Sequence, residues 1–314
     1  MANGAPVPVT DASATVSPEE RGALMRRATY ASVAVAGTLI VAKTGAWAIT
    51  DSVSVLSSLL DSLLDAAASI VNLIAVRHAL APADAEHRFG HGKAEALAGL
   101  AQAAFIGGSA LLLLSEAVHR LWTPVPVESG EIGIAVMALS LILTIGLVRY
   151  QLRIVKLTGS LAVGADRLHY TTDILLNGAV IASLLASVFL RIDMVDPIAG
   201  LAIGVYILWS SAKIARAALD HLMDRELPEE TREKIIAIAR ANPLILDVHD
   251  LRTRAVGPNI SVQMHLEIDG NLTLNQAHGA ADAVEEAVMA AFPGSDVIVH
   301  MDPAGIVENR RDAH

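Results

Sequence analysis

Six stretches of mostly apolar residues constrain this chain more than any other feature. A membrane-spanning helix needs about 20 such residues, and stretches of that length occur at 27–49, 53–79, 94–122, 131–153, 161–190 and 196–219. The composition agrees, since 53% of the 314 residues are hydrophobic and the mean hydropathy is +0.49. We therefore expect an α-helical membrane protein with six transmembrane helices that contacts the lipid bilayer.

The positive charges near the ends of these stretches predict the orientation. Arg and Lys gather before the first stretch and in the connections that follow the second, fourth and sixth, whereas the opposite connections carry few. Basic connections stay on the cytoplasmic side of a membrane. We therefore expect both termini of this multi-pass protein in the cytoplasm.

A different pattern follows after about residue 225. Polar and β-branched residues alternate over 259–268, and Pro228 with two acidic residues opens an amphipathic helix. The expected order is helix 229–241, strand 244–254, strand 259–268, helix 274–291 and strand 295–301. This order predicts a C-terminal α+β ferredoxin-like (αββαβ) cytoplasmic domain. The expected division is a disordered tail at 1–22, the membrane domain at 23–224, the metal-binding cytoplasmic domain at 225–306 and a flexible tail at 307–314.

Charge and cysteine content exclude several classes of function. The chain has a net charge of −10, and most of the excess acid lies after residue 227, so nucleic acid is not an expected partner. There is no cysteine, which rules out disulfides, thiolate metal sites and cysteine nucleophiles. Any metal chemistry must use histidines and carboxylates.

Two pairs of ionisable residues lie inside apolar stretches. Asp61 and Asp65 are four residues apart, as are His169 and Asp173, so each pair occupies one face of its helix. Ionisable groups at membrane depth are costly and mark functional sites. Three carboxylates and an imidazole suit a tetrahedral divalent ion such as Zn²⁺. The alternative is a pair of protonated or hydrogen-bonded side chains packed between helices. Lys43, also within a stretch, fits interhelical hydrogen bonding or snorkelling.

The connection between the second and third stretches carries another candidate cation site. Asp84, His87 and His91 are spaced so that they could wrap an ion at the membrane surface, and Gly90 and Gly92 let the backbone turn. An ordinary polar connector is the alternative.

The predicted cytoplasmic domain contains a third candidate. Four histidines of this acidic segment fall near predicted strand ends or early in its second helix, which predicts a metal cluster, although solvent-exposed histidines remain the alternative. The cluster comprises His249, His265, His278 and His300, with Asp302.

Together these motifs resemble those of a known family, over residues 25 to 303. They are similar to the motifs of the cation diffusion facilitator family, in particular of its bacterial zinc and ferrous-iron efflux branch. The segments that carry the resemblance are Asp61-x-x-x-Asp65, Pro82 to Glu95, Asp166-x-x-His169-x-x-x-Asp173 and His249 to Arg254.

The resemblance implies a homodimeric antiporter that exchanges protons for Zn²⁺ across a bacterial inner membrane, with Fe²⁺, Cd²⁺ or Co²⁺ as further cargo. It implies that Zn²⁺ is also a structural or regulatory ion, and it implies no organic cofactor. By position, Asp61, Asp65, His169 and Asp173 match the transport site, and Asp84, His87 and His91 match a loop site. The five residues of the cytoplasmic cluster match a binuclear site that bridges the dimer. Lys93 and Asp224 match a charge interlock of the dimer at the junction of its membrane and cytoplasmic parts.

One position departs from the family pattern. Met301 stands between the last histidine and aspartate, where a close relative has Gln, and a methionine supplies no oxygen ligand. The resemblance therefore leaves the occupancy of the second cytoplasmic ion open.

Two other classes of function compete with transport. An intramembrane metalloprotease usually carries His-Glu-x-x-His on a helix, and this sequence has no such motif. A non-transporting metal sensor or dimeric scaffold would keep the cytoplasmic cluster but would not need ligands within the membrane. The two intramembrane pairs favour transport, and the chain is not expected to be an enzyme.

Overall fold

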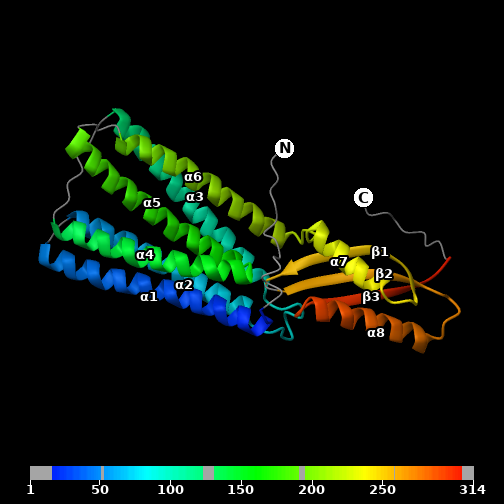
Figure 1. Cartoon of the computed structure of the whole chain (residues 1–314). Coiled ribbons are helices and arrows are strands. Elements are labelled where there is room, and N and C mark those ends of the chain that lie inside the picture. Colours follow the sequence, from blue (N-terminus) through cyan, green and yellow to red (C-terminus); the bar gives the residue numbers. More distant parts are fainter. Residues whose placement is uncertain (1–15, 51–52, 123–130, 191–194, 258, 306–314) are drawn as a thin grey trace.

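The computed structural model describes residues 16–50, 53–122, 131–190, 195–257 and 259–305. These form a long helical bundle and a small sheet domain at one end of it (Figure 1). The bundle helices are α1 (Pro18–Thr50), α2 (Val53–Ala79), α3 (Lys93–Trp122), α4 (Glu131–Thr158), α5 (Leu161–Leu190) and α6 (Val195–Leu222). The expected tail at 307–314, and most of the one at 1–22, lie outside the described residues.

The six expected membrane helices are present. Within the described residues, α1, α2, α3, α4 and α6 are long and apolar enough to cross a membrane. α5 has 30 residues and completes the set. The chain is therefore a multi-pass membrane protein with a six-helix membrane domain.

Helix α1 begins within the segment that was expected to be a tail. Ser17 and Glu20 form a reciprocal capping box, in which each side chain accepts a hydrogen bond of 3.2 Å from the backbone N–H of the other. Pro18 occupies the first helical position, where its missing N–H costs nothing. This local signal starts the helix before the apolar stretch.

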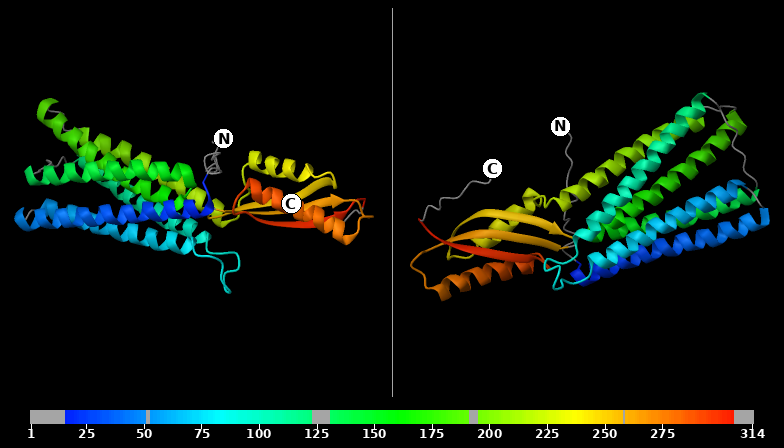
Figure 2. Two further views of the ribbon diagram at one scale, coloured as in Figure 1. Left: turned by 60° about the horizontal axis from the view of Figure 1, so that its bottom comes forward. Right: turned by 180° about the vertical axis from the view of Figure 1, so that it is seen from behind.

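The bundle helices separate away from the sheet domain. α1, α2 and α4 run together, whereas α3, α5 and α6 splay from them towards the far end (Figures 1 and 2). α2 and α5, which carry the two intramembrane pairs, come from opposite groups. The two pairs can therefore meet only where the groups converge.

The cytoplasmic domain has the predicted αββαβ order. Its elements are α7 (Glu229–Arg240), β1 (Ile245–Val256), β2 (Asn259–Ile268), α8 (Leu274–Ala291) and β3 (Asp296–Pro303). The sheet order is β1-β2-β3. β2 pairs antiparallel with β1 and parallel with β3. α8 supplies the crossover that a parallel pair requires.

Only one face of this sheet is packed into the domain core. Met264 and Leu266 of β2 are at most 1% exposed, and they pack with Ile235 of α7 and Val284 of α8. Since side chains alternate across a strand, His265 lies on the opposite face. That face carries the histidines discussed below.

Candidate metal sites

The intramembrane pairs meet between α2 and α5. Nε2 of His169 lies 2.9 Å from Oδ1 of Asp65, and His169 is buried. Asp65, His169 and Asp173 each offer one ligand atom, and these atoms lie within 4.8 Å of one another. Two carboxylates and an imidazole at this spacing form a donor set that fits a divalent cation.

Asp61 does not join this group of three. It is exposed on α2, four residues before Asp65. That separation is about 6 Å along a helix, so Asp61 can approach the same ion only from the side of the group nearer the start of α2.

Polar contacts between helices hold α5 in position. Asp166, one helical turn before His169, accepts hydrogen bonds from Ser32 of α1 at 2.5 Å and from Gln151 of α4 at 2.7 Å. The Tyr170 hydroxyl lies 2.9 Å from Ser69 Oγ on α2. Buried polar contacts of this kind fix helix orientation within a membrane. They set the face of α5 that His169 presents to α2.

The loop between α2 and α3 brings its three predicted ligands together. Asp84 lies 3.4 Å from Nδ1 of His87 and 3.4 Å from Nε2 of His91. The backbone N–H groups of His87 and Glu86 donate to Asp84, and these bonds hold the pKa of the Asp84 carboxyl below its usual range. Asp84 therefore remains ionised and available as a ligand.

Sequence reasoning missed a neighbour of this loop. The ring of His78, near the end of α2, lies 4.5 Å from the ring of His91 in an edge-to-face arrangement. Thirteen positions separate the two in the sequence, and only the return of the loop to α2 brings them together.

The cytoplasmic histidines form a row across the sheet. Strand pairing places His249 opposite His265, and His265 opposite His300. Their ring centroids are 5.4 and 4.6 Å apart along the row. Three strands thus contribute one imidazole each at the same level of the open face.

Asp302 is at the centre of this row. Its Oδ2 lies 2.8 Å from Nδ1 of His265 and 3.1 Å from Nε2 of His249, and its Oδ1 lies 3.1 Å from Nε2 of His300. Asp302 is only 6% exposed. One carboxylate therefore contacts all three histidines.

Asp250 also lies near the row. Its carboxylate is 3.7 Å from Nε2 of His265. The pairing of β1 with β2 shifts between His249 and Arg252, and Asp250 at this bulge adopts φ of 48°. A bulge redirects a side chain, so the alternation of side chains between the two faces of β1 did not reveal this contact.

His278 lies apart from the row within the described chain. It projects from α8, is 67% exposed, and pairs with Asp282 at 3.4 Å. α8 packs on the core face of the sheet, whereas the row occupies the other face. A single chain therefore does not bring His278 to Asp302.

Met301 lies on the other side of its strand from the ligands. Its side chain packs against the domain core, while His300 and Asp302 on either side of it face the row. A Gln at this position would point to the core as well, so the side chain at 301 does not determine the ligand set.

The predicted charge interlock joins α3 to the end of α6. Nζ of Lys93 lies 3.0 Å from Asp224, and Arg254 of β1 shares the same carboxylate at 3.3 Å. Arg254 also lies 5.3 Å from the ring of Phe89 in the loop. Half-exposed ion pairs contribute at most about 1 kcal/mol each, so this network orients the domains more than it stabilises them.

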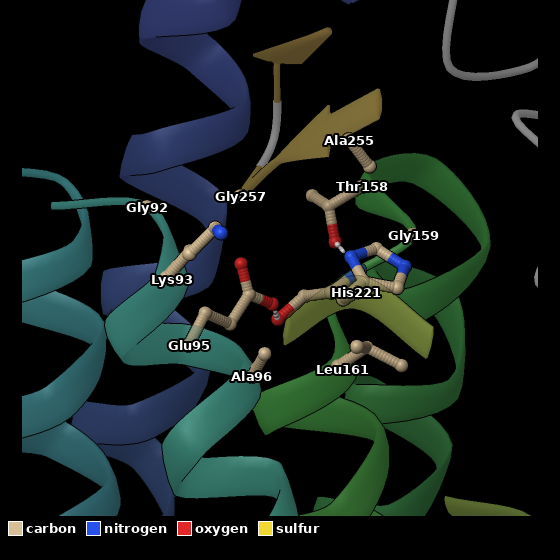
Figure 3. Close-up of a pocket in the computed structure, with 11 residues that line it drawn as sticks. Gly92, Lys93, Glu95, Ala96, Thr158, Gly159, Leu161, His221, Ala255 and Gly257 are labelled. Carbon is tan, nitrogen blue, oxygen red and sulfur yellow. Dashed lines mark hydrogen bonds between the residues drawn. The ribbon is translucent and has the colours of Figure 1, made fainter. Parts of the chain in front are cut away.

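A small pocket lies beside the interlock, where the two domains meet (Figure 3). Glu95 of α3 and His221 of α6 both line it. Glu95 is 4% exposed and accepts a hydrogen bond of 2.5 Å from Ser160 Oγ. A carboxylate at the N-terminus of α5 is favoured by the helix dipole. The hydrogen bond to Glu95 therefore holds the start of α5 against α3, at the junction with the cytoplasmic domain.

Two glycines are in close contact at this junction. A Cβ at Gly92 would lie 2.8 Å from the backbone nitrogen of Gly257 and 2.8 Å from the carbonyl carbon of Val256. The turn between β1 and β2 therefore contacts the backbone of the loop between α2 and α3, where no side chain fits.

Comparison with known proteins identifies the family. The protein-family model for the cation efflux transmembrane domain matches residues 29–223. The protein-family model for the cation efflux cytoplasmic domain matches residues 227–304. The chain belongs to the cation diffusion facilitator (cation efflux) family. It is 47% identical over 286 residues to the cation-efflux pump FieF of Klebsiella pneumoniae subsp. pneumoniae, covering 91% of this chain and 95% of the relative. The FieF of Cronobacter sakazakii is 46% identical over the same coverage.

A solved structure is similar to part of this family member. The protein CzrB in its zinc form is 36% identical, and the match covers 27% of this chain and 98% of that one, with a TM-score of 0.26. The family and relatives confirm the resemblance seen in the sequence.

Proposed function

We propose that this protein is a proton-coupled antiporter that exports divalent metal cations, Zn²⁺ foremost, from the cytoplasm across a bacterial inner membrane. The grouping of Asp65, His169 and Asp173 within the membrane domain carries this proposal. Asp61 is the fourth ligand, reached by a change of its side-chain rotamer or a small movement of α2. Membership in the cation efflux family and the similarity to cation-efflux pumps of the FieF type support the same direction of transport.

Proton coupling follows from the chemistry of the donor set. Metal ligation needs a neutral imidazole and ionised carboxylates, so protons and the metal compete for the same atoms. A site open to the cytoplasm takes up the cation, and a site open to a more acidic exterior releases it as the ligands take up protons. Rocking of α3, α5 and α6 against the other helices provides the alternating access.

The imidazole ligand favours zinc over harder ions. Replacing His169 with Asp is expected to lower the preference for Zn²⁺ over Mn²⁺ by about tenfold or more, because an all-oxygen site suits Mn²⁺. Competition between the two ions in vesicle flux measures this ratio. Unchanged selectivity would show that His169 is not a ligand.

We also propose that two chains form a homodimer through the open face of the cytoplasmic sheet, with metal at the interface. His300 is 62% exposed, and His278 has no access to Asp302 within one chain. The partner's copy of His278 is then the residue that completes the second ion site, as the family resemblance implies.

This arrangement predicts that His278→Ala weakens zinc-dependent dimerisation about tenfold, because a bridging ligand is lost. Analytical ultracentrifugation in detergent, with and without zinc, measures the effect. His119→Ala is the matched control, because it removes a histidine of α3 that belongs to none of the three candidate sites. A zinc response equal to that of the wild type would exclude His278 from the interface.

Flux through liposomes tests the function itself. Purified protein is reconstituted with a zinc-sensitive dye inside the vesicles, and zinc entry is followed with and without a pH gradient. Gradient-dependent flux above that of protein-free vesicles is expected. Zinc binding without flux would instead identify a non-transporting metal sensor or scaffold.

A further inference from the structure

Lys43 of α1 is a buried cation beside the intramembrane group. It is 8% exposed, although Lys is rarely buried without a partner. Its Nζ donates hydrogen bonds to Ser62 Oγ at 2.7 Å and to the carbonyl of Ser58 at 3.0 Å. The side chain is therefore turned into α2 and held there by two partners.

The position of Ser62 places this charge next to the acidic residues. Ser62 follows Asp61 directly and lies one helical turn before Asp65. The charge of Lys43 interacts with Asp61, Asp65 and Asp173. One ammonium thus acts on all the carboxylates assigned to the transported ion.

The charges of this cluster are complementary to those of a divalent cation. Three ionised carboxylates and one ammonium leave a net charge of −2, which a doubly charged ion neutralises. Uncompensated charge is costly inside a membrane. Without the ammonium, the carboxylates would hold a divalent ion in a site with an excess negative charge, and release would slow.

We propose that Lys43 is a fixed counter-charge of the α2–α5 site, which weakens the hold on a divalent cation enough to permit its release. This inference rests on the proposed transport of such an ion through that site. Lys43 is a positioning residue in this role, since its ammonium touches Ser62 and Ser58 rather than the metal. The tether to α2 keeps the charge close while α2 and α5 move.

Zinc flux at varied zinc concentration, measured in the liposomes described above, tests this role. Lys43→Gln keeps a hydrogen-bond donor but removes the charge. We expect its KM for zinc to fall about tenfold, since loss of a nearby like charge strengthens cation binding in a low-dielectric site. We expect its maximal rate to fall as well, because release becomes slower. Lys43→Arg, which keeps the charge, should restore both values towards those of the wild type.

The outcomes separate this inference from the proposed function. A merely structural lysine predicts a lower rate with an unchanged or higher KM for Lys43→Gln, and that result would overturn the counter-charge role. Absence of flux in the wild type would instead overturn the transport proposal.

Should Lys43→Gln fail to fold, Ser62→Ala keeps the charge of Lys43 and removes one of its two hydrogen-bond partners. That variant is expected to shift KM downwards by about twofold, and an unchanged KM would contradict the inference.

Discussion

Asp65→Ala is expected to abolish gradient-driven zinc flux, with a residual rate at least about 100-fold below that of the wild type. Asp65 is the carboxylate that contacts His169 at 2.9 Å across the interface of α2 and α5. Partners outside the ligand shell already change metal affinity by about 10- to 100-fold, so loss of a ligand has a larger effect. Dye-reported zinc entry into liposomes measures the rate.

Two further variants make this result specific. Asp65→Asn keeps the volume and removes the charge, and it should lose flux to a similar extent if ionised ligation is the cause. Glu233→Ala removes an exposed carboxylate from α7, away from the candidate sites, and should transport zinc at the wild-type rate. Flux through Asp65→Ala above about a tenth of the wild-type value would mean that the ion takes another path.

Gly92→Ala is expected to separate the cytoplasmic domain from the start of α3. The added methyl group would meet the backbone of Val256 and Gly257 at 2.8 Å, and backbone cannot move aside as a flexible side chain can. Overpacking of this kind costs about 1–3 kcal/mol. Hydrogen exchange at residues 255–257 should therefore accelerate, and the adjacent contact between Lys93 and Asp224 should weaken.

Gly108→Ala is the matched control, since Gly108 lies in α3, the helix that Gly92 precedes, and a Cβ there meets nothing within 4 Å. Its hydrogen exchange should equal that of the wild type. Equal exchange in the two variants would show that the contact at Gly92 does not hold the domains together.

The fold was largely predictable because each element has a local signal. Apolar length marks the membrane helices, and alternation in β2 separates Met264 and Leu266 in the core from His265 on the open face. The start of α1 was missed because its signal is a capping box outside the apolar stretch. The docking of the β1–β2 turn on Gly92 was not predictable, since it depends on a contact between segments far apart in sequence.

The candidate sites were predictable where ligands repeat along one helix or loop. The spacing of His169 and Asp173, and that of Asp84 and His91, is visible in the sequence. His78 and Asp250 were missed for different reasons. The first approaches its neighbour only through the path of the loop, and the second is turned by a bulge that alternation does not encode.

The row of histidines also has a consequence for the end of the chain. Among the described residues β3 is the last strand and pairs with β2 alone, and it supplies both His300 and Asp302. A metal bound there would fasten this terminal strand to β1 across β2, independently of the backbone ladder. A shortage of that metal would then loosen β3 first, at one edge of the sheet, while β1 at the other edge kept its pairing with β2.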